Sequence, residues 1–184
     1  EMVAEIRRLN QLLDRENALL KDEVRQVRRR WRYVAESPAM AAGLEEGDGG
    51  AHLMTYHPRG PGRSSDYWHD APWLDFNMIQ SSHGAHDHDN GLFVEHDWGL
   101  SPRKPTLDGE PRYEHLPVGF YFRDVSRHDR FDDYDVRQAA YWSLLAGAAG
   151  FTYGNNNVFQ MWTPDRQPGL WACAPWWEAL DHPG

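Results

Sequence analysis

The chain has 184 residues, a formal net charge of −9 and a sequence pI near 5.5. That length suits one domain with a real core or part of a larger domain, and the acidic balance argues against nucleic acid or an acidic membrane surface as the main partner. A hydrophobic content of 40% with 9 Trp is typical of a globular chain rather than a disordered one.

A single cysteine, Cys173, excludes an intrachain disulfide framework and a cysteine-based zinc site. No apolar run approaches the length of a membrane span, and the first residues show no signal-peptide pattern. We therefore expect no membrane partner. The many tryptophans are compatible with sugar binding, because an aromatic face stacks on C–H bonds, but tryptophan is equally a core and interface residue.

Residues 1–32 differ in charge from the rest of the chain, with 9 basic and 6 acidic side chains against 10 basic and 22 acidic in residues 33–184. Apolar residues recur there at three- and four-residue steps, and no glycine or proline intervenes before Pro38, which predicts one long amphipathic helix. Asn17 lies on its apolar seam, as a register-setting residue does in a coiled coil. The helix is expected either to self-associate or to lie on the body of its own domain.

Beyond residue 32 the pattern changes to short strands, loops and helices. We expect a helix end at 39–44 and a glycine-rich loop at 46–50. Strands are expected at 52–58, 73–80, 104–110 and 150–154. Loops are expected at 59–70, 81–84 and 155–157. Helices are expected from about 89 to 99, at 135–147 and at 176–180, the second of which has a predicted buried stripe of Ala140, Tyr141, Leu144 and Leu145.

Strands that alternate with helices imply parallel pairing and right-handed crossovers. Four such units make half of an eight-unit barrel. The predicted fold class is therefore α/β: a partial (β/α)8 TIM barrel, comprising the last four β/α units, preceded by a long N-terminal helix.

The run KPTLDGEPRYE (104–114) reads as a buried strand that stops abruptly, because Gly109 and Pro111 both discourage continuation. Glu110 is thereby placed at the carboxyl end of a strand, which is the edge that carries the site in parallel α/β folds. The alternative is a loop glutamate paired with an arginine. Asp108 is expected to be buried and hydrogen-bonded.

Several polar residues follow the predicted strands and are expected around the same mouth as Glu110. His57, Gln80 and His83 offer neutral donors and acceptors that suit sugar hydroxyls. Glu114 is predicted to hold either a substrate hydroxyl or an arginine. For Tyr153 and Trp162 the alternatives are a stacking platform and ordinary packing.

Histidine and aspartate crowd the span 83–97, which invites a metal interpretation because imidazole and carboxylate are ligands of zinc and manganese. No His-Glu-x-x-His spacing is present, so we expect a solvated polar loop and predict no metal and no cofactor. The residues concerned are His83, His86, Asp87, His88, Asp89, His96 and Asp97.

Four motifs in this order resemble the apiosidase-like glycoside hydrolases, and the resemblance runs from about Trp31 to the C-terminus. The motifs are HLMTYHP (52–58), FNMIQSSH (76–83), KP…GEP with YE (104–114) and GAAGFTYG (147–154). The resemblance implies a TIM-barrel catalytic domain whose strands five to eight lie in this chain, with Glu110 as the nucleophile or base at the end of strand seven. Characterised members release apiose from pectic side chains, and the family suggests a bacterial periplasmic or extracellular location.

The chain departs from the family pattern in two places. The strand-four carboxylate has no match, because residues 1–30 offer a charged helix there. Asn155, Asn156 and Asn157 stand where the family has a histidine-containing loop. Glycoside hydrolysis normally needs two carboxyl groups, so the acid would come from outside this chain or be missing. We expect a C-terminal catalytic half from a truncated or fused gene product.

The leading prediction is thus a glycoside hydrolase module acting on plant cell-wall pectic side chains, with Glu110 as one of two catalytic carboxylates. Two alternatives remain open at this point. One is a non-catalytic module that binds sugar or a partner, and the other is a metal-dependent hydrolase that uses the histidine and aspartate loop.

Overall fold

The structure is a computed structural model that describes residues 12, 15–16, 19–21, 37–81, 83–122, 126–167, 169 and 171–184. The chain divides into two compact units, Glu1–His52 and Leu53–Gly184. Most of the helix predicted at 1–32, and with it the predicted self-association, lies outside the described residues. No helix within the described ranges is long and apolar enough to cross a lipid bilayer.

In the first unit, residues 37–48 form a helix, which ends later than the expected helix end at 39–44. The glycine-rich loop predicted at 46–50 therefore starts too early: residues up to 48 are helical, and only Gly49 and Gly50 form the turn, with φ of +67° and +70°. Asp48 accepts a hydrogen bond from the backbone N–H of His52.

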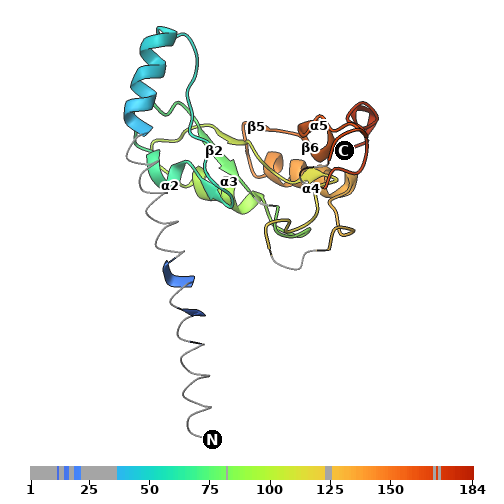
Figure 1. The fold of residues 1–184 in the computed structure, drawn as a ribbon. Coiled ribbons are helices and arrows are strands. Elements are labelled where there is room, and N and C mark those ends of the chain that lie inside the picture. Colours follow the sequence, from blue (N-terminus) through green and yellow to red (C-terminus); the bar gives the residue numbers. More distant parts are fainter. Residues whose placement is uncertain are drawn as a thin grey trace, which may run out of the picture. The chain divides into compact units, whose positions relative to one another are not determined.

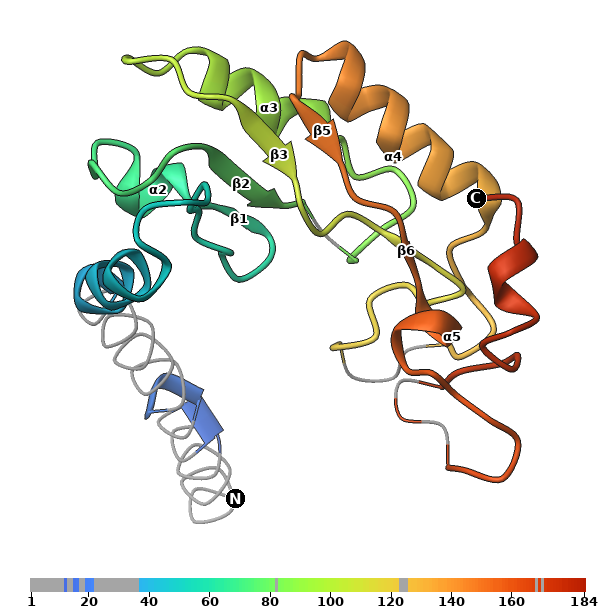
Figure 2. The same cartoon turned by 90° about the horizontal axis from the view of Figure 1, so that it is seen from above.

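The second unit contains a four-stranded sheet in the order β1-β2-β3-β5 (Figure 2), of which Figure 1 labels β2 and β5. Its strands β2 (Asn77–Gln80), β3 (Thr106–Asp108) and β5 (Gly150–Phe151) are parallel, as the sequence predicts, and β1 (Gly62–Arg63) pairs antiparallel with β2. A separate parallel pair joins β4 (Tyr113–Glu114) to β6 (Gly154–Asn155).

Two helices cover one face of this sheet. α3 (Gly91–Trp98) and α4 (Asp133–Leu145) lie side by side against β3 and β5 (Figure 2). Both were predicted within two residues at each end. The remaining helices are short: α2 (Ser65–Trp68), α5 (Asn156–Phe159) and the 3-10 helix η1 (Ala179–Asp181), which overlaps the helix predicted at 176–180.

The strand predicted at 52–58 is wrong. The carbonyl of Met54 accepts a hydrogen bond from the backbone N–H of Asp75, and the N–H of Met54 donates to the Asp75 carboxylate. The hydroxyl of Thr55 donates to the carbonyl of Phe76. Side chains thus satisfy bonds that a backbone ladder would make. The segment runs beside the approach to β2 without becoming a strand.

The loop predicted at 59–70 is also wrong in part, because it contains β1 and α2. The contacts of Ser64 explain how a segment with the composition of a loop pairs with β2. Its N–H donates to the carbonyl of Met78 at 2.8 Å, and its hydroxyl accepts from the N–H of Met78 at 2.9 Å. A serine side chain thereby extends the pairing with β2 without any apolar alternation in the sequence.

The inward face of α4 differs from the predicted stripe. Val136 and Ala139 are buried together with Asp135 and Ser143, whereas Tyr141 and Leu145 are 64% and 83% exposed. Leu144 is exposed and Ala140 half-buried. Polar contacts set this orientation, because Asp135 closes a capping box with Asp132 and Ser143 bonds to Asp108 beneath the helix.

Candidate active site

Glu110 follows β3 at the carboxyl edge of the sheet, where the sequence places it. The N–H groups of Gly109 and Glu110 both point to the carbonyl of Ile79, at 3.0 and 3.3 Å, and the N–H of Ser81 takes the carbonyl of Glu110. Two residues thus oppose one, which is the pattern of a β-bulge. A bulge re-aims the side chain that follows it, so Glu110 need not share the orientation of Asp108.

Two histidines hold the carboxylate of Glu110. Nε2 of His57 lies 3.0 Å from Oε2, and Nε2 of His83 lies 3.0 Å from Oε1. The Glu110 side chain is 22% exposed and that of His83 only 5%. An ionised carboxylate is acceptor-only, so each Nε2 carries a proton and donates. The structure thus brings His57 and His83 to the Glu110 carboxylate, although no strand precedes His57.

The pKa of Glu110 reflects this arrangement. Burial raises it, but hydrogen bonds from His57 and His83, together with their charges, outweigh burial and hold the pKa at about 2. The same hydrogen bond raises the pKa of His57, against burial that lowers it. Glu110 is consequently an anion over the whole range in which proteins work.

Tyr113 is a further residue at this carboxylate, and it was not predicted. Burial, followed by the charge of Glu110 and a hydrogen bond to it, raises the Tyr113 pKa to about 12. The ring lies edge-on to His83, with centroids 4.8 Å apart. Tyr113 remains a neutral phenol that can donate to Glu110. The only sequence signal for it is its place three residues after Glu110.

Gly154 on β6 makes room for this tyrosine. A Cβ at Gly154 would overlap the Cδ1 atom of Tyr113, to which it is paired across the β4–β6 ladder. We expect Gly154→Ala to destabilise the fold by about 1–3 kcal/mol, because the Tyr113 ring must move. Urea denaturation would measure it. Gly43→Ala is the matched control, because Gly43 lies in a helix and an added Cβ would meet no atom within 4 Å. It should stabilise the fold by about 0.5–1 kcal/mol, since alanine favours a helix more than glycine does.

Asp108 lies on the helix side of the sheet and is fully buried, as predicted. Ser143 on α4 donates to it at 2.7 Å and Asn90 at 2.9 Å, while the Ser81 hydroxyl lies 3.3 Å from both of its oxygens. Burial raises the pKa of Asp108 and these hydrogen bonds lower it, with burial the larger effect. Asp108 therefore ties β3 to α3 and α4 rather than facing the site.

Arg112 is the second buried polar residue of this strand end, with 1% exposure. Its guanidinium donates to the Asn90 side chain at 2.9 Å, to Gln138 at 3.0 Å and to the carbonyl of Asp135 at 3.2 Å, and it also bonds to the carbonyl of His88. It thereby joins the loop after β2 to α4. No sequence pattern singles out Arg112.

The other predicted contact residues have different partners in the described part of the chain. Gln80 packs against Gly60. Glu114 is buried and accepts a hydrogen bond from the hydroxyl of Tyr153, whose ring is 45% exposed. Trp162 is half-buried and donates its indole N–H to the carbonyl of Arg166 at 2.9 Å.

The loop predicted at 155–157 is instead the end of β6 and the start of α5. Asn155 caps this helix, accepting from the N–H groups of Asn157 and Val158. The side chain of Asn157 is buried and accepts from the N–H of Cys173 at 2.8 Å. Asparagine favours such caps because its short side chain reaches nearby N–H groups.

The histidines of the span 83–97 have separate partners. His83 is bonded to Glu110, and His96 lies 3.2 Å from Asp97. His86 bridges Asp129 and Asp135 at 2.8 and 2.9 Å, and the hydrogen bond to Asp129 is the largest cause of its raised pKa. These side chains form no common ligand set in the described part of the chain.

A different group of side chains has the donor types that bind a metal. Glu114, His115 and His182 place one ligand atom each within 4.8 Å of one another. The two rings have centroids 4.4 Å apart, and burial, followed by the charge of His182, lowers the pKa of His115, which favours its neutral, ligating form. Protein groups already occupy this cluster: Tyr153 bonds to Glu114, and Asn155 lies 3.1 Å from His182.

The low pKa of Glu110 gives a testable pH dependence. We expect the carboxyl to titrate with a midpoint of about 2, against an ordinary value of 4.5. Because the folded-state pKa is depressed, the resulting stabilisation is present above pH 4.5 and is lost as the pH falls toward 2. Carbon-13 NMR, with Glu110→Gln to assign the signal, would measure it. His57→Gln should shift the midpoint upward; a wild-type midpoint near 4.5 would contradict the assigned contacts.

Comparisons with known proteins identify the family of this chain. Residues 20–184 match the apiosidase-like catalytic domain. No curated protein sequence is significantly similar to the chain. A solved structure described as a glycoside hydrolase is 40% identical with a TM-score of 0.74, and the match covers 82% of this chain and 36% of that one.

A second solved structure, a family 5 glycoside hydrolase from Bacteroides vulgatus, is 38% identical with a TM-score of 0.72. The match covers 80% of this chain and 35% of that one, so the chain spans much less than half the length of either relative. Because the family match extends over most of the sequence, the chain belongs to the apiosidase-like family of glycoside hydrolases.

Proposed function

We propose that the chain is a glycoside hydrolase module that releases apiose from plant pectic side chains, with Glu110 as one of two catalytic carboxylates. The observation that carries the proposal is an ionised carboxylate at the carboxyl edge of a parallel sheet, held by His57 and His83 at 3.0 Å each. In this proposal the three parallel strands belong to a (β/α)8 barrel, whose active site lies at that edge.

The chemistry proposed for Glu110 follows from its pKa of about 2. A group that stays ionised cannot protonate a leaving oxygen, so Glu110 is assigned as the nucleophile or the general base. The anion also stabilises the positive charge that develops at the anomeric carbon. His57 and His83 orient it and keep it ionised.

The general acid is proposed to come from outside the described strands. Among the described residues, the groups that contact the Glu110 carboxylate are His57, His83 and Tyr113. None of these is a carboxyl group. The relatives contain more than half a chain that this sequence does not match, and a second carboxylate there would complete the pair.

An activated substrate tests the proposal without requiring the acid. Dinitrophenolate departs from a sugar as the anion and needs no protonation by a general acid. Hydrolysis of a dinitrophenyl apioside therefore requires only the nucleophile or base. We expect faster dinitrophenolate release from the apioside than from the matching xyloside or arabinofuranoside, measured by absorbance against a buffer blank. No release above the blank from any of the three would overturn the hydrolase assignment.

A sugar-binding module without hydrolysis is the second candidate, favoured by the single carboxylate among the described residues at the site. It predicts affinity for an apiose-terminated pectic oligosaccharide in calorimetry, with no turnover of the activated apioside. Turnover would exclude it.

A further inference from the structure

The segment 117–122 carries three consecutive aromatic residues that the chemistry of Glu110 does not use: Phe120, Tyr121 and Phe122. We call it the aromatic loop. The N–H of Phe120 donates to the carbonyl of Pro117 at 3.2 Å, and that of Phe122 to the carbonyl of Gly119 at 2.7 Å. Gly119 has a φ of +62°, and a Cβ there would meet the Phe122 ring at 2.6 Å. Two successive turns therefore fix the loop.

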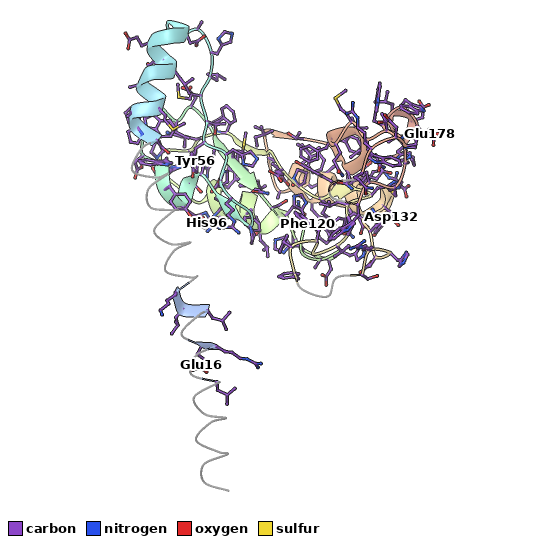
Figure 3. The ribbon with its side chains drawn as sticks, viewed as in Figure 1. Glu16, Tyr56, His96, Phe120, Asp132 and Glu178 are labelled. Atoms are coloured by element: carbon purple, nitrogen blue, oxygen red, sulfur yellow. The ribbon has the colours of Figure 1, made fainter. Side chains whose placement is uncertain are left out.

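The aromatic loop is attached to the residue that holds the catalytic carboxylate. The N–H of Gly119 donates to the carbonyl of His83 at 2.7 Å, and the rings of Phe120 and His83 have centroids 5.9 Å apart. Figure 3 labels Phe120 on this part of the ribbon. The opposite end of His83 bonds to Glu110 at 3.0 Å. One histidine thus links the loop to the site.

The two outer rings of the loop are open to solvent. Tyr121 is 47% exposed and Phe122 60% exposed, and their centroids lie 4.6 Å apart, with Tyr121 5.1 Å from Phe120. The inner ring, Phe120, is half-buried against His83. Exposure therefore increases along the loop, from Phe120 beside His83 to Tyr121 and then Phe122.

We propose that the aromatic loop is a stacking subsite for the sugar ring next to the bond that is cleaved, on the leaving-group side of the substrate. The face of an aromatic ring has a negative electrostatic potential, which attracts the C–H bonds of a sugar face. A terminal sugar must be enclosed around Glu110, whereas an open platform suits the chain that extends away from it. The inference rests on the proposed function, because it takes Glu110 as the centre of cleavage.

Binding to a catalytically blocked protein tests this subsite. In the Glu110→Gln background, calorimetry would compare an apiose-terminated pectic oligosaccharide with free apiose. We expect Tyr121→Ala to weaken oligosaccharide binding about 3- to 10-fold, as expected for loss of one aromatic contact. Binding of free apiose should be unchanged, and Tyr121→Trp should retain the affinity.

Tyr134→Ala is the matched control, because Tyr134 is a 63% exposed tyrosine on α4. It should change neither affinity. Circular dichroism of each variant would establish that it is folded. Equal oligosaccharide affinity in the parent and Tyr121→Ala proteins would overturn the subsite, as would a parent that does not bind the oligosaccharide.

The failure of this inference differs from the failure of the proposed function. Hydrolysis of the activated apioside together with an ineffective Tyr121→Ala change removes the subsite alone. A weakened oligosaccharide complex without any hydrolysis removes the catalytic assignment and leaves an aromatic sugar-binding surface.

Discussion

Replacing Glu110 by glutamine should lower kcat for the activated apioside on the order of 10³-fold. The amide has nearly the shape of the carboxylate but supplies neither a nucleophilic oxygen nor a base. His57 and His83 would also lose the anion to which they donate at 3.0 Å. Initial rates of dinitrophenolate release from wild type and Glu110→Gln measure the effect.

Two further variants make this result specific to the site. Glu95→Gln removes an exposed carboxylate from α3 and should leave kcat unchanged. In Glu110→Ala, added azide can take the place of the missing carboxylate and should restore part of the activity as glycosyl azide, identified by mass spectrometry. Equal turnover by wild type and Glu110→Gln would remove Glu110 from the mechanism.

Replacing Arg112 by methionine should destabilise the fold by at least about 3 kcal/mol, because four neutral acceptors lose their donor and each one that stays buried costs about 1–3 kcal/mol. Arg112 is 1% exposed, and four acceptors from the loop after β2 and from α4 converge on it. Methionine fills similar space but donates nothing, so the carbonyls and amides stay desolvated and unpaired. Urea denaturation followed by circular dichroism measures the change.

Arg137→Met is the control for this prediction, because it removes an arginine from the exposed side of the same helix. Arg137 donates to Asp133 four residues earlier, with both side chains more than a third exposed. Its replacement should cost less than about 0.5 kcal/mol. If Arg112→Met proves as mild as this control, the buried arginine is not what joins the loop to α4.

The ends of the parallel strands were the most predictable part of the site. Glycine and proline around Glu110 mark where the chain leaves the sheet after β3, and the carboxyl ends of parallel strands lie at one edge. His57, His83 and Glu110 meet although 26 or 27 residues separate each histidine from its neighbour in the sequence. Strand order suffices to bring His83 and Glu110 together, because they follow β2 and β3, whereas His57 follows no strand.

The buried polar network was less predictable. Apolar periodicity pointed to Tyr141 and Leu145 as the inward face of α4, but Ser143 faces inward because it bonds to Asp108. The segment 52–58 is a short run that ends at a proline, which predicts a strand, yet the Asp75 side chain accepts the hydrogen bond from the Met54 N–H. Patterns of hydrophobicity do not record which side chain replaces a backbone partner.

The β-bulge at Gly109 and Glu110 allows the Asp108 and Glu110 side chains to lie in different surroundings. Asp108 is buried between the sheet and α4, and burial raises its pKa. Glu110 instead accepts hydrogen bonds from histidines, which lower its pKa. Without the bulge, strict alternation would place residues 108 and 110 on the same face of the strand, and the Glu110 carboxylate would enter the buried layer beside Asp108. One extra backbone residue thus separates Asp108, which stabilises the fold, from Glu110, which faces the candidate site, although the two are only two positions apart.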